Sequence, residues 1–169
     1  KADAETVCDH EVVDLSEIVR RVFRMLVPLA DQTQVQLTAN LDRDCFVLSM
    51  EDDVYQIIFN LVENGIKYNH PDGSVHVTVS HTADEVELLV EDTGMGIPKA
   101  SIEHIFERFY RVDKARSRQA GGSGLGLSIV HALVTRNFGT IDVSSEEGKG
   151  TRFMVHLPYF ALEEDGEDA

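Results

Sequence analysis

Helical and strand-like spacings of apolar residues follow one another along this chain, and their order limits the folds open to it. Helical spacing covers residues 15–31, 51–68 and 124–137. Strand-like runs cover residues 35–39, 45–48, 75–79, 86–90, 140–144 and 151–157. Helices separated by runs of strands predict an α+β sandwich, with helices on one face of a largely antiparallel sheet.

Local signals set the ends of the predicted helices. Asp14 and Glu17 stand in an Asp-x-x-Glu arrangement that caps a helix start. Residues 51–53 place three acids in the first turn of the second helix, where they suit the helix dipole. Ser123 is the expected cap of the third helix. The residues of that helix spaced for burial are Leu125, Ile129, Ala132 and Leu133.

The chain is strongly acidic, which excludes some classes of partner. Among 169 residues, 30 are acidic and 15 are basic, so the formal net charge is −15. This balance repels phosphate backbones and anionic lipids, so we expect no nucleic-acid or membrane-surface binding. Cys8 and Cys45 form no Cys-x-x-Cys pair, which favours a reducing, cytosolic setting. The sequence lacks a membrane-spanning run, a signal peptide and an initiator methionine, and we expect a fragment of a longer protein.

Four polar residues near the end of the second helix share one stripe of its surface. They are Asn60, Asn64, Lys67 and Tyr68. The neighbouring apolar stripe contains Val54, Ile58, Leu61 and Val62. Amide oxygens can ligate hard cations such as Mg²⁺, a lysine supplies a charge for phosphate, and a tyrosine ring offers a stacking surface. A ligand site and an ordinary solvated helix face both fit, and these four residues alone favour the solvated face.

The segment from Asp92 to Ile97 follows a predicted strand and contains two glycines. Gly94 and Gly96 would let the backbone approach a ligand closely. An ionised aspartate only accepts hydrogen bonds, so Asp92 would recognise a donor such as an adenine amino group and would repel phosphate. The alternative is a plain Asp/Gly turn.

A second glycine-rich segment, residues 121–127, opens the third predicted helix. Exposed N–H groups at a helix N-terminus attract anions, and glycines remove side chains that would block them. The alternative is a flexible loop that enters a capped helix. The sequence contains no Gly-x-x-x-x-Gly-Lys-Ser/Thr and no Gly-x-Gly-x-x-Gly, which argues against a P-loop or a standard dinucleotide site.

Residues 93–123 lack sustained alternation and contain only a short helical candidate at 99–107. Six basic and three acidic residues give this segment a local balance of +3. Cations in a glycine-hinged segment are typical of a lid over a polyphosphate. Phe106, Phe109 and Tyr110 either attach this lid to the body of the domain or form a small satellite core.

In their order along the chain, these segments resemble the ATP-binding catalytic domain of sensor histidine kinases, within the wider family of gyrase, Hsp90 and MutL ATPases. The resemblance runs from Asp14 to Pro158. The matching segments are the N box (60–68), first glycine box (92–97), F box (106–111), second glycine box (122–127) and last hairpin (148–153). It implies a Bergerat-type two-layer α/β sandwich with a mixed sheet and three main helices.

The resemblance implies a role for each matching residue. Asn64 and Asn60 would hold Mg²⁺ at the phosphates of ATP, and Lys67 would contact a phosphate. Tyr68 would lie against the adenine or ribose, and Asp92 would accept a hydrogen bond from the adenine amino group. These assignments make ATP the substrate and Mg²⁺ the metal of the site.

Further residues are implied to touch the nucleotide. Arg111 would reach the γ-phosphate when the lid closes, so that transfer depends mainly on positioning and on charge neutralisation by Mg²⁺, Lys67 and Arg111. The remaining implied contacts are Gly94, Gly96, Ile97, Phe109, Tyr110, Gly122, Gly124, Leu125, Gly126, Leu127 and Thr151.

Asn60 helps to separate branches of the wider family. In the gyrase and MutL branch, the position four residues before the Mg²⁺-binding asparagine carries a glutamate that activates water, and an asparagine cannot act as a general base. Transfer to a protein acceptor therefore fits better than rapid hydrolysis. Glu63 is the nearest carboxylate in sequence. It either polarises an incoming histidine or faces solvent, and we favour the solvent-facing alternative slightly.

The resemblance divides the chain into a linker (1–13), the catalytic domain (14–158, with the lid at about 93–123) and an acidic tail (159–169). His10 is followed by Glu-Val-Val, not by the Glu-Leu-Arg-Thr-Pro context of a phosphoaccepting histidine. We therefore expect the acceptor on a missing helical dimerisation domain.

A response regulator would receive the phosphoryl group from that acceptor. We expect a monomeric fragment from a homodimeric parent that is attached to the inner membrane, with this domain in the cytoplasm. The alternatives are a serine kinase of the same superfamily and a nucleotide-gated interaction module that transfers nothing.

Overall fold

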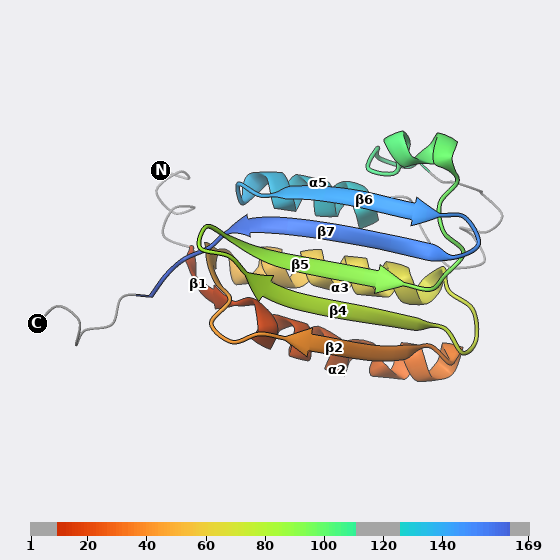
Figure 1. Ribbon diagram of the computed structural model, residues 1–169, viewed down its shortest axis with the longest axis horizontal. Coiled ribbons are helices and arrows are strands. Elements are labelled where there is room, and N and C mark those ends of the chain that lie inside the picture. Colours follow the sequence, from red (N-terminus) through yellow and green to blue (C-terminus); the bar gives the residue numbers. More distant parts are fainter. Residues whose placement is uncertain (1–9, 111–125, 163–169) are drawn as a thin grey trace, which may run out of the picture.

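The computed structural model describes residues 10–110 and 126–162 (Figure 1). Its helices are α2 (Leu15–Thr33), α3 (Glu51–Lys67), the 3-10 helix η1 (Lys99–His104) and α5 (Gly126–Arg136). Its strands are β1 (Glu11–Asp14), β2 (Gln36–Leu41), β3 (Phe46–Ser49), β4 (Ser74–His81), β5 (Glu85–Asp92), β6 (Thr140–Glu146) and β7 (Gly150–Pro158).

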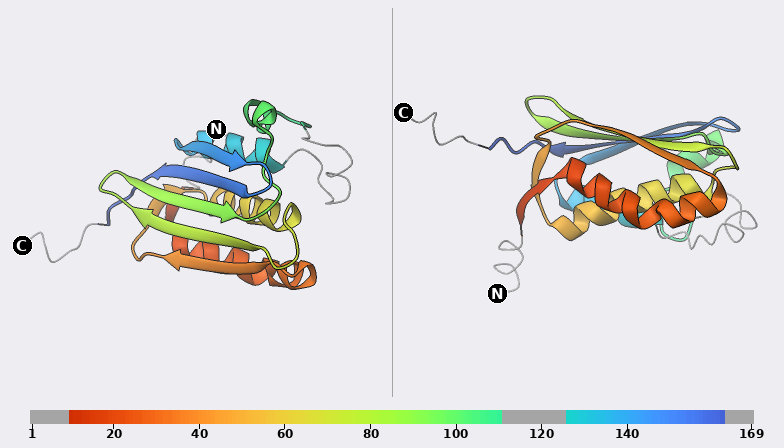
Figure 2. Two further views of the ribbon diagram at one scale, coloured as in Figure 1. Left: turned by 45° about the vertical axis from the view of Figure 1, so that its right-hand side comes forward. Right: turned by 90° about the horizontal axis from the view of Figure 1, so that it is seen from below.

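Five of the described strands form one mixed sheet with helices on one face. The order of the five-stranded sheet is β2-β4-β5-β7-β6, in which β2 pairs with β4 in parallel and the other neighbours are antiparallel. Figure 2 shows the sheet as one layer and α2, α3 and α5 as the other. The predicted α+β two-layer sandwich is confirmed.

The core lies between these two layers. Alternate residues of β4 and β5 are fully buried, including Val77 and Val90, and they face the buried stripe of α3 that contains Ile58 and Leu61. Period-two burial on the strands and helical spacing on α3 account for this packing. The predicted hairpin of β4 and β5 and the predicted apolar stripe of α3 are both present.

The helix starts agree only in part with the sequence signals. The Asp14 carboxylate accepts hydrogen bonds from the N–H groups of Ser16 and Glu17, at 3.1 and 3.4 Å, and caps α2 as predicted. Two of the three acids at the start of α3 pair with other helices. Glu51 contacts Arg21 of α2 at 2.5 Å, and Asp53 is buried against the end of α5. These acids therefore join helices as well as suiting the dipole of α3.

The predicted buried face of α5 is wrong. Ile129 and Ala132 are exposed and Leu133 is only half-buried, whereas Val130 and Val134 are fully buried. Ile129 and Val130 are neighbours of similar hydropathy, so the periodicity admits two stripes about 100° apart, and packing against α3 selects the second. Ser123 and Leu125 lie outside the described residues.

Strand β1 was not expected from the sequence. It pairs antiparallel with β3 in a separate two-stranded sheet, with Val13 buried opposite Val47. Four residues are too few to show a reliable alternation, which is why the pairing is not visible in the sequence. Within residues 10–110 and 126–162, no helix combines the length and apolar composition of a membrane span.

Candidate functional site

The N box and the first glycine box lie at the same end of the molecule, where α3 and β5 both end (Figure 1). The N–H of Met95 donates to the carbonyl oxygen of Tyr68 at 3.0 Å. A Cβ atom on Gly94 would overlap that same carbonyl oxygen, so only glycine fits there. The Cβ of Asp92 lies 3.3 Å from the position that a Cβ on Gly65 would take. These contacts bring the two sequence segments together as one site.

Asp92 is held at the end of β5 by backbone hydrogen bonds. Its carboxylate accepts hydrogen bonds from the backbone N–H groups of Gly94, at 2.8 Å, and Thr151. Burial raises the pKa of Asp92 to about 6, although these two hydrogen bonds act in the opposite direction. A buried carboxylate with remaining acceptor capacity suits a ligand that brings its own N–H donor.

The turn between β6 and β7 closes over the first glycine box. Gly96 has a φ of +72°, and a Cβ there would overlap the carbonyl oxygen of Glu146. The N–H of Gly148 donates to the carbonyl of Met95 at 2.8 Å, and the N–H of Ile97 donates to the Ser145 hydroxyl at 2.8 Å. The box is therefore held from both sides, by the end of α3 and by this turn.

The polar stripe of α3 faces the start of α5. The Asn60 Nδ2 group donates to the Gln56 carbonyl at 2.8 Å, and its Oδ1 lies 3.6 Å from where a Cβ on Gly126 would be. Asn64 is half-buried one turn further along and makes no side-chain hydrogen bond with the described residues. Two available amide oxygens fit a hard cation such as Mg²⁺.

Lys67 and Glu63 form an ion pair on α3. Their Nζ and Oε2 atoms are 3.6 Å apart, and the side chains are only 28% and 27% exposed. The sequence left Glu63 open between a role in transfer and a solvent-facing position. Its side chain is half-buried and pairs with Lys67, so Glu63 is partly shielded from solvent, and a role in transfer stays a prediction.

The sequence left two roles open for the aromatic residues of the F box: to attach this segment to the body of the domain, or to form a small satellite core. Each role fits some of these residues. Phe106 attaches this segment to the body, because its ring lies 6.4 Å from that of Phe153 in the core and 5.4 Å from that of His131 on α5. The Tyr110 hydroxyl donates to Ser101 at 2.9 Å, which is a local contact. Phe109 is 65% exposed and has a φ of +66°.

Some predicted site residues cannot be placed. Arg111, Gly122, Gly124 and Leu125 lie outside the described residues. Among the described ones, Gly126 begins α5 and Leu127 packs against the core. Thr151 is buried, and its hydroxyl lies 2.9 Å from that of Ser145. Ser145 was missed, although a serine at an inward position of β6 beside Gly-Lys-Gly-Thr was a usable signal.

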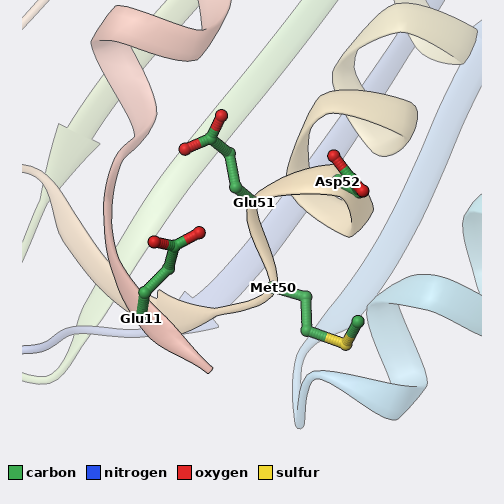
Figure 3. A pocket seen from close by; sticks show the side chains of 4 residues that line it. All are labelled: Glu11, Met50, Glu51 and Asp52. Atoms are coloured by element: carbon green, nitrogen blue, oxygen red, sulfur yellow. The ribbon is translucent and has the colours of Figure 1, made fainter. Parts of the chain in front are cut away.

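A hollow at the other end of α3 does not belong to this site. Glu11, Met50, Glu51 and Asp52 line it, and Figure 3 shows their side chains around the start of α3. Its three carboxylates would repel the phosphates of a nucleotide.

Comparison with known proteins decides the family. The model of the family described as "Histidine kinase-, DNA gyrase B-, and HSP90-like ATPase" matches residues 49–160. The chain belongs to this family. The match begins at the last residue of β3 and takes in α3, the glycine-box region and the β6–β7 hairpin, so it covers the elements that form the site of this ATPase domain.

Named relatives of this histidine kinase-type ATPase domain are sensor kinases. Sensor histidine kinase WalK of Bacillus subtilis is 43% identical over 83% of the chain and 23% of its own length. Sensor-like histidine kinase SenX3 of Mycolicibacterium smegmatis is 36% identical over 98% of the chain and 43% of its own length. The chain thus spans less than half of these relatives.

Solved structures agree with the fold. The mycobacterial sensor histidine kinase MprB aligns with a TM-score of 0.80 at 27% identity, over 90% of this chain and all of that one. A full-length ShkA structure, described as a complex with AMPPNP, aligns with a TM-score of 0.78 over 92% of this chain and 32% of that one. The domain therefore has the architecture of histidine kinase catalytic domains.

Proposed function

We propose that this domain binds ATP with Mg²⁺ and transfers the γ-phosphoryl group to a histidine of a helical dimerisation domain in a two-component signalling system. The observation that carries the proposal is the buried Asp92 carboxylate, held by Gly94 and Thr151 at the point where the N box and first glycine box meet. The names of the relatives support the same activity.

Asp92 would select the base of the nucleotide. An ionised carboxylate accepts a hydrogen bond from the 6-amino group of adenine, whereas it repels the 6-oxo group of guanine. Gly94 and Gly96 let the loop pack closely against the backbone of Tyr68 and Glu146, which would hold Asp92 in place for the base. Tyr68, which directly follows α3 beside this loop, would lie against the adenine or ribose.

The phosphates would extend from this pocket toward the start of α5. Backbone N–H groups at a helix start attract anions, and Gly126 adds no side chain there. Lys67 would turn from Glu63 to a phosphate. Asn60 and Asn64 would hold Mg²⁺, which when bound neutralises phosphate charge. Arg111 stays a predicted γ-phosphate contact.

Asn60 favours transfer over hydrolysis, because an amide cannot accept the proton of an attacking water. In the transfer step, the imidazole nitrogen of the acceptor histidine bonds to the γ-phosphorus. The bond from that phosphorus to the bridging oxygen breaks, ADP leaves with the electron pair, and the imidazolium proton passes to solvent. The chain's own residues supply position and charge.

The proposal extends to the parent protein. It would be a homodimer attached to the inner membrane, with this domain in the cytoplasm, and the acceptor histidine would pass its phosphoryl group to a response regulator. The names of WalK and SenX3 support a sensor histidine kinase as the parent.

Titration calorimetry with Mg-ATP tests the site, and Asp92→Asn is expected to abolish binding. Unchanged affinity in that variant would refute the adenine assignment. Labelled ATP mixed with the separately produced phosphoacceptor segment of the same full-length protein tests the reaction. Acid-labile phosphohistidine is expected. ATP binding without labelling would favour a nucleotide-gated interaction module, and acid-stable phosphoserine a serine kinase.

A further inference from the structure

We propose that Ser145 is a positioning residue that sets the preference of the site for adenine over guanine nucleotides. This inference rests on the proposed function. Ser145 lies near the end of β6 and belongs to none of the sequence motifs. Its hydroxyl nevertheless connects the two ends of the loop that carries Asp92.

The hydroxyl of Ser145 has hydrogen-bond partners on both sides. It accepts from the N–H of Ile97, at 2.8 Å, and it lies 2.9 Å from both the carbonyl oxygen of Gly150 and the hydroxyl of Thr151. A hydroxyl has one proton to donate and lone pairs for two acceptances, so one serine can satisfy all three contacts. Ser145 is half-buried, which protects these bonds from water.

Each partner of Ser145 is connected to Asp92. Ile97 is the last residue of the first glycine box, which begins at Asp92. The N–H of Thr151 donates to the Asp92 carboxylate, and a Cβ on Gly150 would overlap the Asp92 carbonyl oxygen. Ser145 therefore connects Ile97, at the end of the loop, to strand β7, which holds Asp92 at the start of the same loop.

This arrangement affects specificity more than general affinity. Adenine and guanine differ at position 6 by a donor and an acceptor, so discrimination depends on where the Asp92 oxygen lies. If the loop loosens, the carboxylate loses its fixed position, and the bond to the adenine amino group weakens. Guanine nucleotides do not make this hydrogen bond, so their affinity does not depend on the position of the Asp92 carboxylate.

The test compares two neighbouring serines of β6. Ser144 is exposed and points to the opposite face of the strand from Ser145. Dissociation constants of Mg-ATP and Mg-GTP are measured for the whole 169-residue chain and for Ser145→Ala, Ser145→Thr and Ser144→Ala. Thermal unfolding of each variant reports whether it is folded.

We expect Ser145→Ala to weaken ATP binding by about tenfold, which is the size of effect expected when one buried hydrogen bond is lost. The affinity for GTP is expected to change little. The ATP-to-GTP preference then falls by the same factor. Ser145→Thr, which keeps the hydroxyl, and Ser144→Ala are expected to retain the wild-type preference within about twofold, below the effect of a hydrogen bond.

Three results would overturn the inference: an unchanged ATP-to-GTP preference in Ser145→Ala, an equal loss for both nucleotides, or the same loss in Ser144→Ala. The proposed function fails differently, in a wild-type chain that does not bind ATP or in Asp92→Asn with unchanged ATP affinity. A wild-type chain that binds both nucleotides equally would refute the role of Asp92 and of Ser145 together.

Discussion

The guanidinium of Arg136 donates two hydrogen bonds to the buried carboxylate of Asp53, at 3.0 Å from Nε and 2.5 Å from Nη2. Asn137 adds a third donor at 2.9 Å, and its own amide oxygen accepts from the Ser49 hydroxyl at 2.6 Å. This network joins the first turn of α3 to the last turn of α5, at the opposite end of α3 from Asn64.

Asp53→Ala is expected to lower the free energy of unfolding by about 2 kcal/mol, because it removes the acceptor of a buried amide and of a charged partner. Arg136 remains largely in water, which limits the cost. Urea unfolding measures the change, and ATP affinity of the folded variant is expected to stay the same. Asp52→Ala, one residue earlier and exposed, is the matched control. Equal destabilisation by both variants would contradict the importance of the network.

Nucleotide affinity is expected to fall as the pH drops below about 6, where Asp92 becomes protonated. Each pH unit below that value lowers the ionised fraction about tenfold, and with it the affinity for adenine. Titrations of ADP between about pH 8 and pH 5 measure this dependence. Constant affinity across that range would mean that the charge on Asp92 does not contribute to binding.

The ionisation of Asp92 has opposite effects on nucleotide affinity and on the free energy of unfolding. Burial raises the pKa of Asp92 from 3.8 to about 6, so the folded protein binds this proton more tightly than the unfolded one. Its contribution to stability is therefore most favourable below about pH 4 and falls as the pH rises to 6. Asp92→Asn removes the charge, and we expect it to stabilise the domain at pH 7 by about 1–3 kcal/mol while it abolishes ATP binding. Urea unfolding at pH 7 gives the difference; a less stable variant would contradict it.

Gly96→Ala is expected to cost stability and at least tenfold in ATP affinity. Gly96 and Gly148 both have positive φ, but a Cβ on Gly96 would overlap the Glu146 carbonyl, whereas nothing lies within 4 Å of a Cβ on Gly148. Gly148→Ala thus carries only the backbone strain of about 1 kcal/mol. Calorimetric titration of the pair separates the two effects. Equal affinity in both variants would show that close packing at Gly96 is unimportant for binding.

Lys67→Met is expected to weaken ATP binding by about tenfold, the typical loss of one hydrogen bond to a charged group, and to leave adenosine binding unchanged. Lys67 would contact the phosphates and not the base. Glu63→Gln, which removes the ion-pair partner of Lys67 at 3.6 Å, is expected to leave ATP binding equal or stronger. Competition titrations with ATP and adenosine measure both. A parallel loss of adenosine binding in Lys67→Met would indicate a structural role instead.

The sequence predicts the regular elements well where their signals are local. The alternation of Val75, Val77 and Val79 and the apolar stripe of α3 each determine a buried face without help from distant residues. The role of Asp92 can also be predicted from its neighbours in sequence. A carboxylate that follows a strand and precedes two glycines indicates a hydrogen-bond acceptor that a ligand can approach closely.

Other features depend on contacts between distant parts of the chain. Nothing near Asp53 in sequence indicates Arg136, because only packing of α3 on α5 brings them together. The pairing of β1 and the choice of Val130 over Ile129 as the buried residue have the same origin. The partners of Ser145 likewise come from distant segments, the loop after β5 and strand β7.

The dependence of Asp92 on Thr151 has a consequence for the order of folding. Strand β7 is the last of the described strands, and it pairs with β5 across the residues that form α5 and β6. Such long-range pairing closes late, because it carries a large loop entropy. A chain folded only as far as β5 would have the N box and glycine box but no donor from Thr151. ATP would therefore bind and stabilise only completely folded molecules. The fraction of a sample that ATP protects from unfolding would then give the fraction that is completely folded.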